Sequence, residues 1–258
     1  MERINTSKPR GLNTNGLRAW GMIFLLLGIL GKSLLQNGML GMGSANAQEL
    51  LEGVLSTDMG MTVATVALAL QALQTMAAPL FCFLLVEGVL HTGDFWKYFG
   101  RVAALAVLSE VPYNLAMSGK VLDLSSRNTV FGLVLAMILL YLYRRYSQPG
   151  FRNVVLKILF TLAAVLWGQI LKISDGACCA VLVAVLWGLR TKPLYRNVLG
   201  CAFSFACCVI NPFYVVSPMS FLILHYYNGE KGEENRVMNY LAYPAFLLII
   251  GLCAKFLL

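Results

Sequence analysis

Long apolar runs separated by short polar segments dominate the chain. The runs occupy residues 17–35, 61–90, 102–117, 128–143, 154–171, 176–189, 197–226 and 240–258. A membrane-spanning helix needs about 20 predominantly apolar residues, and several of the runs approach or exceed that length. Strands of a membrane barrel would alternate polar and apolar residues instead. The pattern therefore predicts an all-α, polytopic integral membrane helical bundle.

The number of spans depends on how two of the runs are interpreted. Run 61–90 is long for one span and contains Pro79, which predicts a tilted helix or a break. Run 197–226 contains Asn211-Pro212 and Pro218, and is either one kinked helix or two short ones. We therefore expect eight to nine transmembrane helices in a single domain, 17–258, after a polar cytoplasmic tail, 1–16.

The first run could instead belong to a cleaved signal peptide. Its apolar stretch is long for that role, and the nearest small-x-small sequence, Ala45-Asn46-Ala47, lies about ten residues beyond it. We therefore expect this run to be a retained helix.

Composition supports the membrane interpretation. Hydrophobic residues make up 59% of the 258 residues and charged residues only 12%, whereas a soluble domain has about 25% charged residues. The net charge of +8 lies mainly in the tail and in segments 91–101, 144–153 and 190–196, between apolar runs. Such Lys/Arg-rich segments are typical of cytoplasmic loops, so we expect a cytoplasmic N-terminus, the lipid bilayer as partner, and no nucleic acid.

Cysteine and histidine usage indicates no metal site. All seven cysteines lie inside apolar runs without CxxC spacing, which is typical of small buried apolar side chains. The two histidines, His91 and His225, are far apart in the sequence. We therefore expect neither a metal centre nor a disulfide framework.

The strongest candidate for chemistry inside the apolar runs is the pair Glu87 and His91. The two residues are four apart, so on a helix they share one face and the carboxylate could orient the imidazole. An oriented histidine is a plausible general base. Alternatively, His91 is an interfacial residue and Glu87 is the partner of a loop arginine.

A second set of polar residues has similar alternatives. Glu110 and Asn114 are also four apart, and flank Pro112; they are either site residues or the polar end of a kinked helix. Asn128 and Asp175 open later runs, where helix capping is the alternative role. Because isolated charges in lipid are costly, we expect Glu87, His91, Glu110 and Asp175 to face one another or a shared cavity.

Taken in order, these motifs resemble the core of the TraX family over residues 76–248. The motifs are PLFCFLLVEG at 79–88, His91-Thr92, Lys97-Tyr98, Arg101, SEVPYNLA at 109–116, Asn128, Asp175-Gly176, Tyr227-Asn228-Gly229 and Tyr243-Pro244. Each motif alone has low specificity, whereas the ordered set is fairly specific.

The resemblance implies a membrane acyltransferase in the bacterial cytoplasmic membrane. The activity expected is transfer of an acetyl (acyl) group from acetyl-CoA to an amine or hydroxyl of a peptide, a pilin or a small molecule. The implied catalytic residues are His91, Glu87, Glu110 and Asp175. The implied substrate- and cofactor-binding residues are Lys97, Arg101, Asn114, Asn128, Tyr227 and Asn228.

Two departures from the family pattern keep an alternative open. Members usually have an Asp-His pair in the first helix, where this chain has Gly28-Ile29, and often a histidine where this chain has Phe246. If the first-helix histidine is the family's base, either His91 replaces it or the chain transfers no acyl group. The alternative is therefore a non-catalytic protein on the same scaffold that acts in binding, transport or partner stabilisation.

Overall fold

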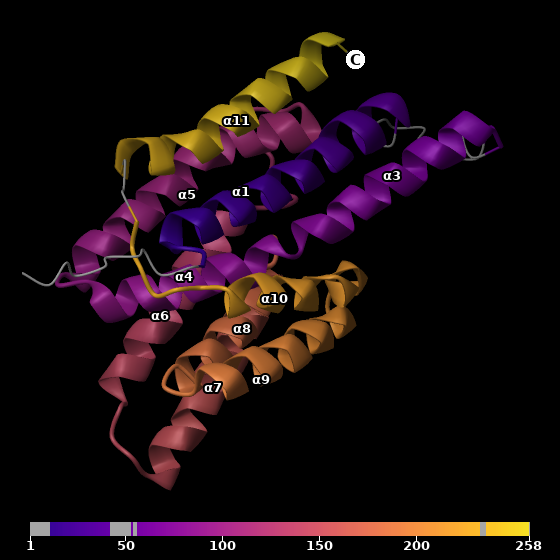
Figure 1. Cartoon of the computed structure of the whole chain (residues 1–258). Helices are drawn as coiled ribbons and strands as arrows, with labels where there is room; N and C mark the ends of the chain where they lie inside the picture. Colours follow the sequence, from indigo (N-terminus) through magenta and orange to yellow (C-terminus); the bar gives the residue numbers. More distant parts are fainter. Residues whose placement is uncertain (1–10, 42–52, 54–55, 233–235, 258) are drawn as a thin grey trace, which may run out of the picture.

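The computed structural model describes residues 11–41, 53, 56–232 and 236–257, and within these all regular structure is helical (Figure 1). The helices are α1 (Thr14–Leu30), which continues as the π-helix η1 (Gly31–Met39), α3 (Asp58–Gln74), α4 (Ala77–His91), α5 (Phe95–Ser118), α6 (Thr129–Arg145), α7 (Phe151–Ile170), α8 (Gly176–Gly188), α9 (Pro193–Ala206), α10 (Ser220–His225) and α11 (Arg236–Leu257). Short 3-10 turns at Cys207–Val209, Pro212–Val215 and Ser217–Met219 connect α9 to α10.

Three helical stretches are long and apolar enough to cross a membrane, the second of them formed by α3 and α4 together: Thr14–Met39, Asp58–His91 and Phe151–Ile170. Shorter apolar helices cover Gly176–Gly188, Pro193–Val209 and Tyr240–Lys255. The helical class expected from the sequence is confirmed, and the composition and these apolar helices define a helical membrane protein.

Helix α8 is the centre of one half of the bundle, between α4, α6, α7 and α9. It is apolar on all sides, and Cys179, Leu182 and Leu186 are completely buried. Glycines allow its neighbours to approach closely: a Cβ on Gly168 of α7 would lie 2.8 Å from the backbone nitrogen of Ala177. Such small-residue contacts are typical of packing between membrane helices.

Several helix boundaries differ from those that the apolar runs predicted. Helix α5 begins at Phe95, inside the expected linker 91–101, because the carboxylate of Asp94 accepts a hydrogen bond from the backbone N–H of Lys97 (3.1 Å). Run 61–90 is broken at Thr75, and Pro79 lies in the first turn of α4, where its missing N–H has no intrahelical partner to lose.

The polar tail and the run 197–226 also differ from the boundaries that the sequence predicted. Helix α1 begins at Thr14, whereas the sequence predicted a polar tail to residue 16, and run 197–226 is divided between α9 and α10. Residues 1–10 of the tail and the sequence Ala45-Asn46-Ala47 lie outside the described residues.

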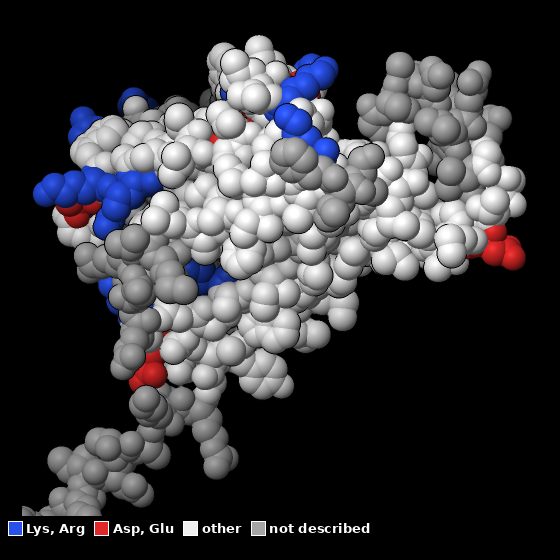
Figure 2. Space-filling view, turned by 90° about the horizontal axis from the view of Figure 1, so that it is seen from above, with Lys and Arg blue, Asp and Glu red and all other residues white. Residues whose placement is uncertain are grey.

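Charge is distributed unevenly along the helix bundle. In Figure 2, basic side chains gather toward the left of the view, the side on which α4 ends and α11 begins in Figure 1. A small group of acidic atoms lies at the opposite tip, where α3 begins, and Asp58 is the first residue of that helix. The basic end is also the end at which α1 begins, and a cavity opens there.

Candidate functional site

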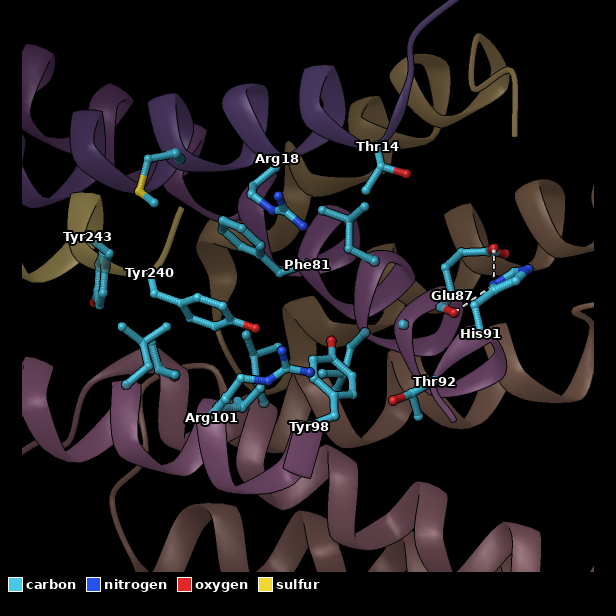
Figure 3. A pocket seen from close by; sticks show the side chains of 18 of the residues that line it. Thr14, Arg18, Phe81, Glu87, His91, Thr92, Tyr98, Arg101, Tyr240 and Tyr243 are labelled. Atoms are coloured by element: carbon cyan, nitrogen blue, oxygen red, sulfur yellow. Dashed lines mark hydrogen bonds and ion pairs between the residues drawn. The ribbon is translucent and has the colours of Figure 1, made fainter. Parts of the chain in front are cut away.

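A cavity of about 580 Å³ opens at the basic end of the bundle. Its walls come from α1, α4, α5, α6 and α11 and from the segment that follows α10 (Figure 3). It therefore joins parts of the chain that are more than 200 residues apart in sequence, such as Arg18 and Tyr243.

The rim of the cavity is fixed by backbone hydrogen bonds between the start of the described chain and the segment after α10. The N–H of Leu12 donates to the carbonyl of Tyr226 (2.8 Å), and the N–H of Asn228 donates back to the carbonyl of Leu12 (2.9 Å). The N–H of Thr14 donates to the carbonyl of Glu230 (2.9 Å). These contacts place Tyr227 at the cavity, where its ring also packs edge-on against Phe83 at 5.1 Å.

Glu87 and His91 lie on one face of α4 at the rim, as their spacing predicted. Nδ1 of His91 lies 2.9 Å from the carbonyl oxygen of Glu87 and 3.6 Å from its Oε2. If Nδ1 carries the proton, Nε2 is the acceptor nitrogen of the neutral ring. The His91 side chain is 77% exposed, however, so water has free access to it.

Three basic side chains line the cavity: Arg18 on α1, Arg101 on α5 and Lys231 after α10. Arg101 stacks over the ring of Tyr98, with 5.9 Å between the guanidinium carbon and the ring centroid, and forms no ion pair with a described residue. Gly88 makes room for this arrangement, since a Cβ there would lie 2.6 Å from the Tyr98 hydroxyl oxygen. The rim is therefore suited to an anionic group.

The inner part of the cavity is apolar, with walls formed by side chains such as Met22, Leu25, Leu105 and Leu133. The cavity thus combines a cationic opening with an apolar interior, which suits an amphiphilic anion.

Glu110 and Asn128 form a separate cluster that does not line the cavity. Oε2 of Glu110 accepts hydrogen bonds from Nδ2 of Asn128 (2.6 Å) and from its backbone N–H (3.3 Å), and Arg127 lies 3.5 Å from Oε1. Asn128 also donates to the carbonyl of Ala106 (2.9 Å) and caps α6 by accepting from the N–H of Val130 (3.0 Å). Every polar group of Asn128 is paired, and these hydrogen bonds attach the start of α6 to α5. The cluster therefore has the geometry expected of a structural contact between the two helices.

Asp175 and Asn114 do not line the cavity either. Asp175 accepts a hydrogen bond from the hydroxyl of the buried Tyr214 (3.1 Å), and its backbone φ is +57°. Asn114 is 2% exposed on α5. Of the four residues expected to face one another or a shared cavity, Glu87 and His91 line the cavity, whereas Glu110 and Asp175 do not and are hydrogen-bonded elsewhere.

Two further predicted binding residues, Lys97 and Asn228, do not line the cavity. Lys97 is 83% exposed and pairs with Asp94 (3.3 Å), and the backbone N–H of Lys97 lowers the pKa of the Asp94 carboxyl. The side chain of Asn228 accepts from the N–H of Glu230 (3.0 Å), which closes a turn. Among the described residues, no three His, Cys, Asp or Glu side chains are grouped as metal ligands.

Sequence reasoning missed Arg18, Lys231 and Tyr240 as cavity residues. Arg18 carried a signal, because it is a charged residue at the start of the first apolar run. Tyr243, which also lines the cavity, belonged to a quoted motif but had been given no role.

Fold and site together define a helical membrane protein with an amphiphilic cavity at its basic end. The family model described as "TraX protein" matches residues 54–254, and the chain therefore belongs to the TraX family. The resemblance inferred from the ordered motifs is thus confirmed.

One curated relative is similar over most of its length. It is a probable fimbrial assembly protein, FimC of serogroup H1, from Dichelobacter nodosus, and it is 25% identical over 203 residues. The matched region covers 70% of this chain and 81% of the relative. No solved structure matches the chain.

Proposed function

We propose that this chain is a membrane acyltransferase that moves an acetyl (acyl) group from acyl-CoA to an amine or hydroxyl acceptor. The observation that carries the proposal is the cavity, whose basic rim would hold phosphates and whose apolar interior would hold the uncharged arm of the donor. The resemblance to TraX proteins implies the same reaction class. In this reaction the acceptor's nitrogen or oxygen bonds to the carbonyl carbon, the C–S bond breaks, and the acceptor's proton ends on the CoA thiol.

The donor site would be formed mainly by Arg18, Arg101 and Lys231. Arginine and lysine are the usual partners of phosphate groups, and arginine can bind them through two parallel hydrogen bonds. Acetyl-CoA is cytoplasmic, so this assignment requires the basic end of the bundle to face the cytoplasm, as the distribution of Lys and Arg favours.

We also propose nine membrane passes with a cytoplasmic N-terminus in the bacterial inner membrane. The hydrogen bonds between Thr14 and Glu230 support this count, because they put the segment after α10 on the side where α1 begins. An even number of passes then precedes α11. This requires α9 to cross in one direction and the segment 207–225, which consists of the 3-10 turns and α10, to cross in the other. A reporter fused after residue 258 should be exposed outside the cell, whereas a cytoplasmic reporter would support eight passes.

The acceptor we propose is the terminal amine of a peptide such as a pilin subunit. The name of the relative, a probable fimbrial assembly protein, supports an acceptor that belongs to a surface fibre. The test is transfer of radiolabelled acetyl from acetyl-CoA to a synthetic pilin N-terminal peptide by the purified protein in nanodiscs. An N-terminally blocked peptide is the matched control, and equal labelling of the two peptides would reject the amine.

One observation favours the non-catalytic alternative. Gly28 packs so closely that a Cβ there would lie 2.2 Å from Cβ of Gln74, and Ile29 is 1% exposed. The first-helix position of the family's Asp-His pair is therefore occupied by tight packing between α1 and α3. Binding of acetyl-CoA without any turnover, across peptide and hydroxyl acceptors, would establish this alternative.

A further inference from the structure

The hydroxyl of Tyr243 is the unusual polar group of the cavity. Tyr243 is 2% exposed and lines the cavity, yet its hydroxyl oxygen has no hydrogen-bond partner among the described residues. Two serine hydroxyls share this condition, Ser33 and Ser109, but neither lines the cavity. Buried polar groups are usually paired, so this hydroxyl at the cavity wall is available to pair with an atom of a bound ligand.

Tyr243 lies at the end of the cavity away from Glu87 and His91 (Figure 3). Its depth follows from the packing of α11 on α5, in which Gly251 lies against Ala116 and the two helices run in the same direction. Counted back eight residues from Gly251 and Ala116, Tyr243 is level with Leu108, which is roughly 10 Å along α5 from Arg101 at a rise of 1.5 Å per residue.

The groups around the Tyr243 hydroxyl indicate which kind of ligand atom could accept a hydrogen bond from it. The cavity wall includes Val130 and Leu133 on α6, Leu105 on α5 and the hydroxyl-bearing Thr129 and Tyr240. Outside the cavity, Glu110 and Asp175 are close enough to interact electrostatically with the Tyr243 hydroxyl. An anionic ligand atom would be costly beside these carboxylates, whereas a neutral acceptor such as a carbonyl oxygen would pair with the hydroxyl. A ligand that is anionic at the rim and ends in a carbonyl fits both ends of the cavity.

We propose that the inner end of the cavity binds the thioester carbonyl of the acyl donor, with the Tyr243 hydroxyl as its hydrogen-bond donor. This inference rests on the proposed function. The phosphates of acyl-CoA lie at Arg18 and Arg101, and its long uncharged arm runs inward to Tyr243. At the inner end the thioester is shielded from water, whereas at His91 it would be exposed to hydrolysis. A donor aimed at the carbonyl oxygen also stabilises the negative charge that develops there during attack.

The test compares two donors that differ only in the carbonyl oxygen. Acetyl-CoA and its thioether analogue S-ethyl-CoA have nearly the same size and the same phosphates. The protein in nanodiscs should bind acetyl-CoA about 2- to 10-fold more tightly, as expected for one net hydrogen bond. Tyr243→Phe should abolish this preference while leaving the affinity for S-ethyl-CoA unchanged.

Tyr195→Phe is the matched control, since Tyr195 is an exposed residue of α9 outside the cavity, and it should retain the preference. If Tyr243→Phe kept the preference for acetyl-CoA over S-ethyl-CoA, or if the unmodified protein showed no such preference, the role of Tyr243 would be overturned and the proposed function would remain. Failure to bind either CoA derivative would overturn the proposed function as well. Thermal unfolding of Tyr243→Phe should match that of the unmodified protein, because the removed hydroxyl has no partner to lose.

Discussion

Replacing Arg101 with Gln tests the donor site most simply. Arg101 lies on α5 at the cavity rim, stacks over Tyr98 and forms no ion pair with a described residue, so its charge is available to a ligand. A hydrogen bond to a charged group contributes about 1.5–3 kcal/mol. Because Arg101 is exposed, water and salt screen the interaction, and about 1–2 kcal/mol is the better expectation.

The expected result is therefore roughly 5- to 30-fold weaker binding of acetyl-CoA to Arg101→Gln. Calorimetry in nanodiscs at two salt concentrations measures it, and the difference should shrink at high salt. Pantetheine, which lacks the phosphates, should bind both proteins equally. Arg152→Gln, an exposed change on α7 outside the cavity, is the control. Equal affinities of Arg101→Gln and the unmodified protein for acetyl-CoA would refute the assignment.

Three further substitutions test the packing of α7 on α8, the contact between α5 and α6, and the rim of the cavity. Gly168→Ala would bring a methyl group against the backbone of α8 and should lower the free energy of unfolding by about 1–3 kcal/mol. Gly188→Ala is the control, because its methyl group would meet nothing within 4 Å and should leave the stability unchanged. Thermal unfolding of the two variants measures the difference. Asn128→Ala, which removes the cap of α6 and the partner of Glu110, should cost about 2–4 kcal/mol of stability at unchanged acetyl-CoA affinity. An affinity loss without a stability loss would make Asn128 a binding residue. His91→Ala should raise KM for acetyl-CoA several-fold at nearly constant kcat, because His91 lies at the exposed rim. A kcat loss of about 10²–10⁴-fold would instead establish His91 as the base.

Features governed by local spacing could be predicted from the sequence. The apolar runs located most of the helices, and the separation of Glu87 and His91 fixed them on one face of α4. The first residues of the helices were predicted less well. The charged residues that were interpreted as parts of linkers also cap helices or lie in their first turns. Asp94 is the example: it ends the linker and caps α5 eight residues before the predicted start.

The division of the predicted site into two regions could not be predicted, because it depends on how neighbouring helices overlap. The start of α6 packs near the middle of α5, where Asn128 reaches the carbonyl of Ala106, and so Glu110 is drawn away from the cavity. Arg18 and Lys231 likewise line one cavity because the backbone near Leu12 pairs with the segment after α10. Such long-range contacts leave no periodic signal in the sequence.

The central claim is that the cavity at the basic end is the acyl-CoA site. The most direct measurement is the structure of the protein in nanodiscs with saturating acetyl-CoA, determined by electron cryomicroscopy. The account predicts phosphate density between Arg18 and Arg101, and acetyl density within hydrogen-bond distance of the Tyr243 hydroxyl. An empty cavity, or acetyl-CoA bound at another surface, would contradict it.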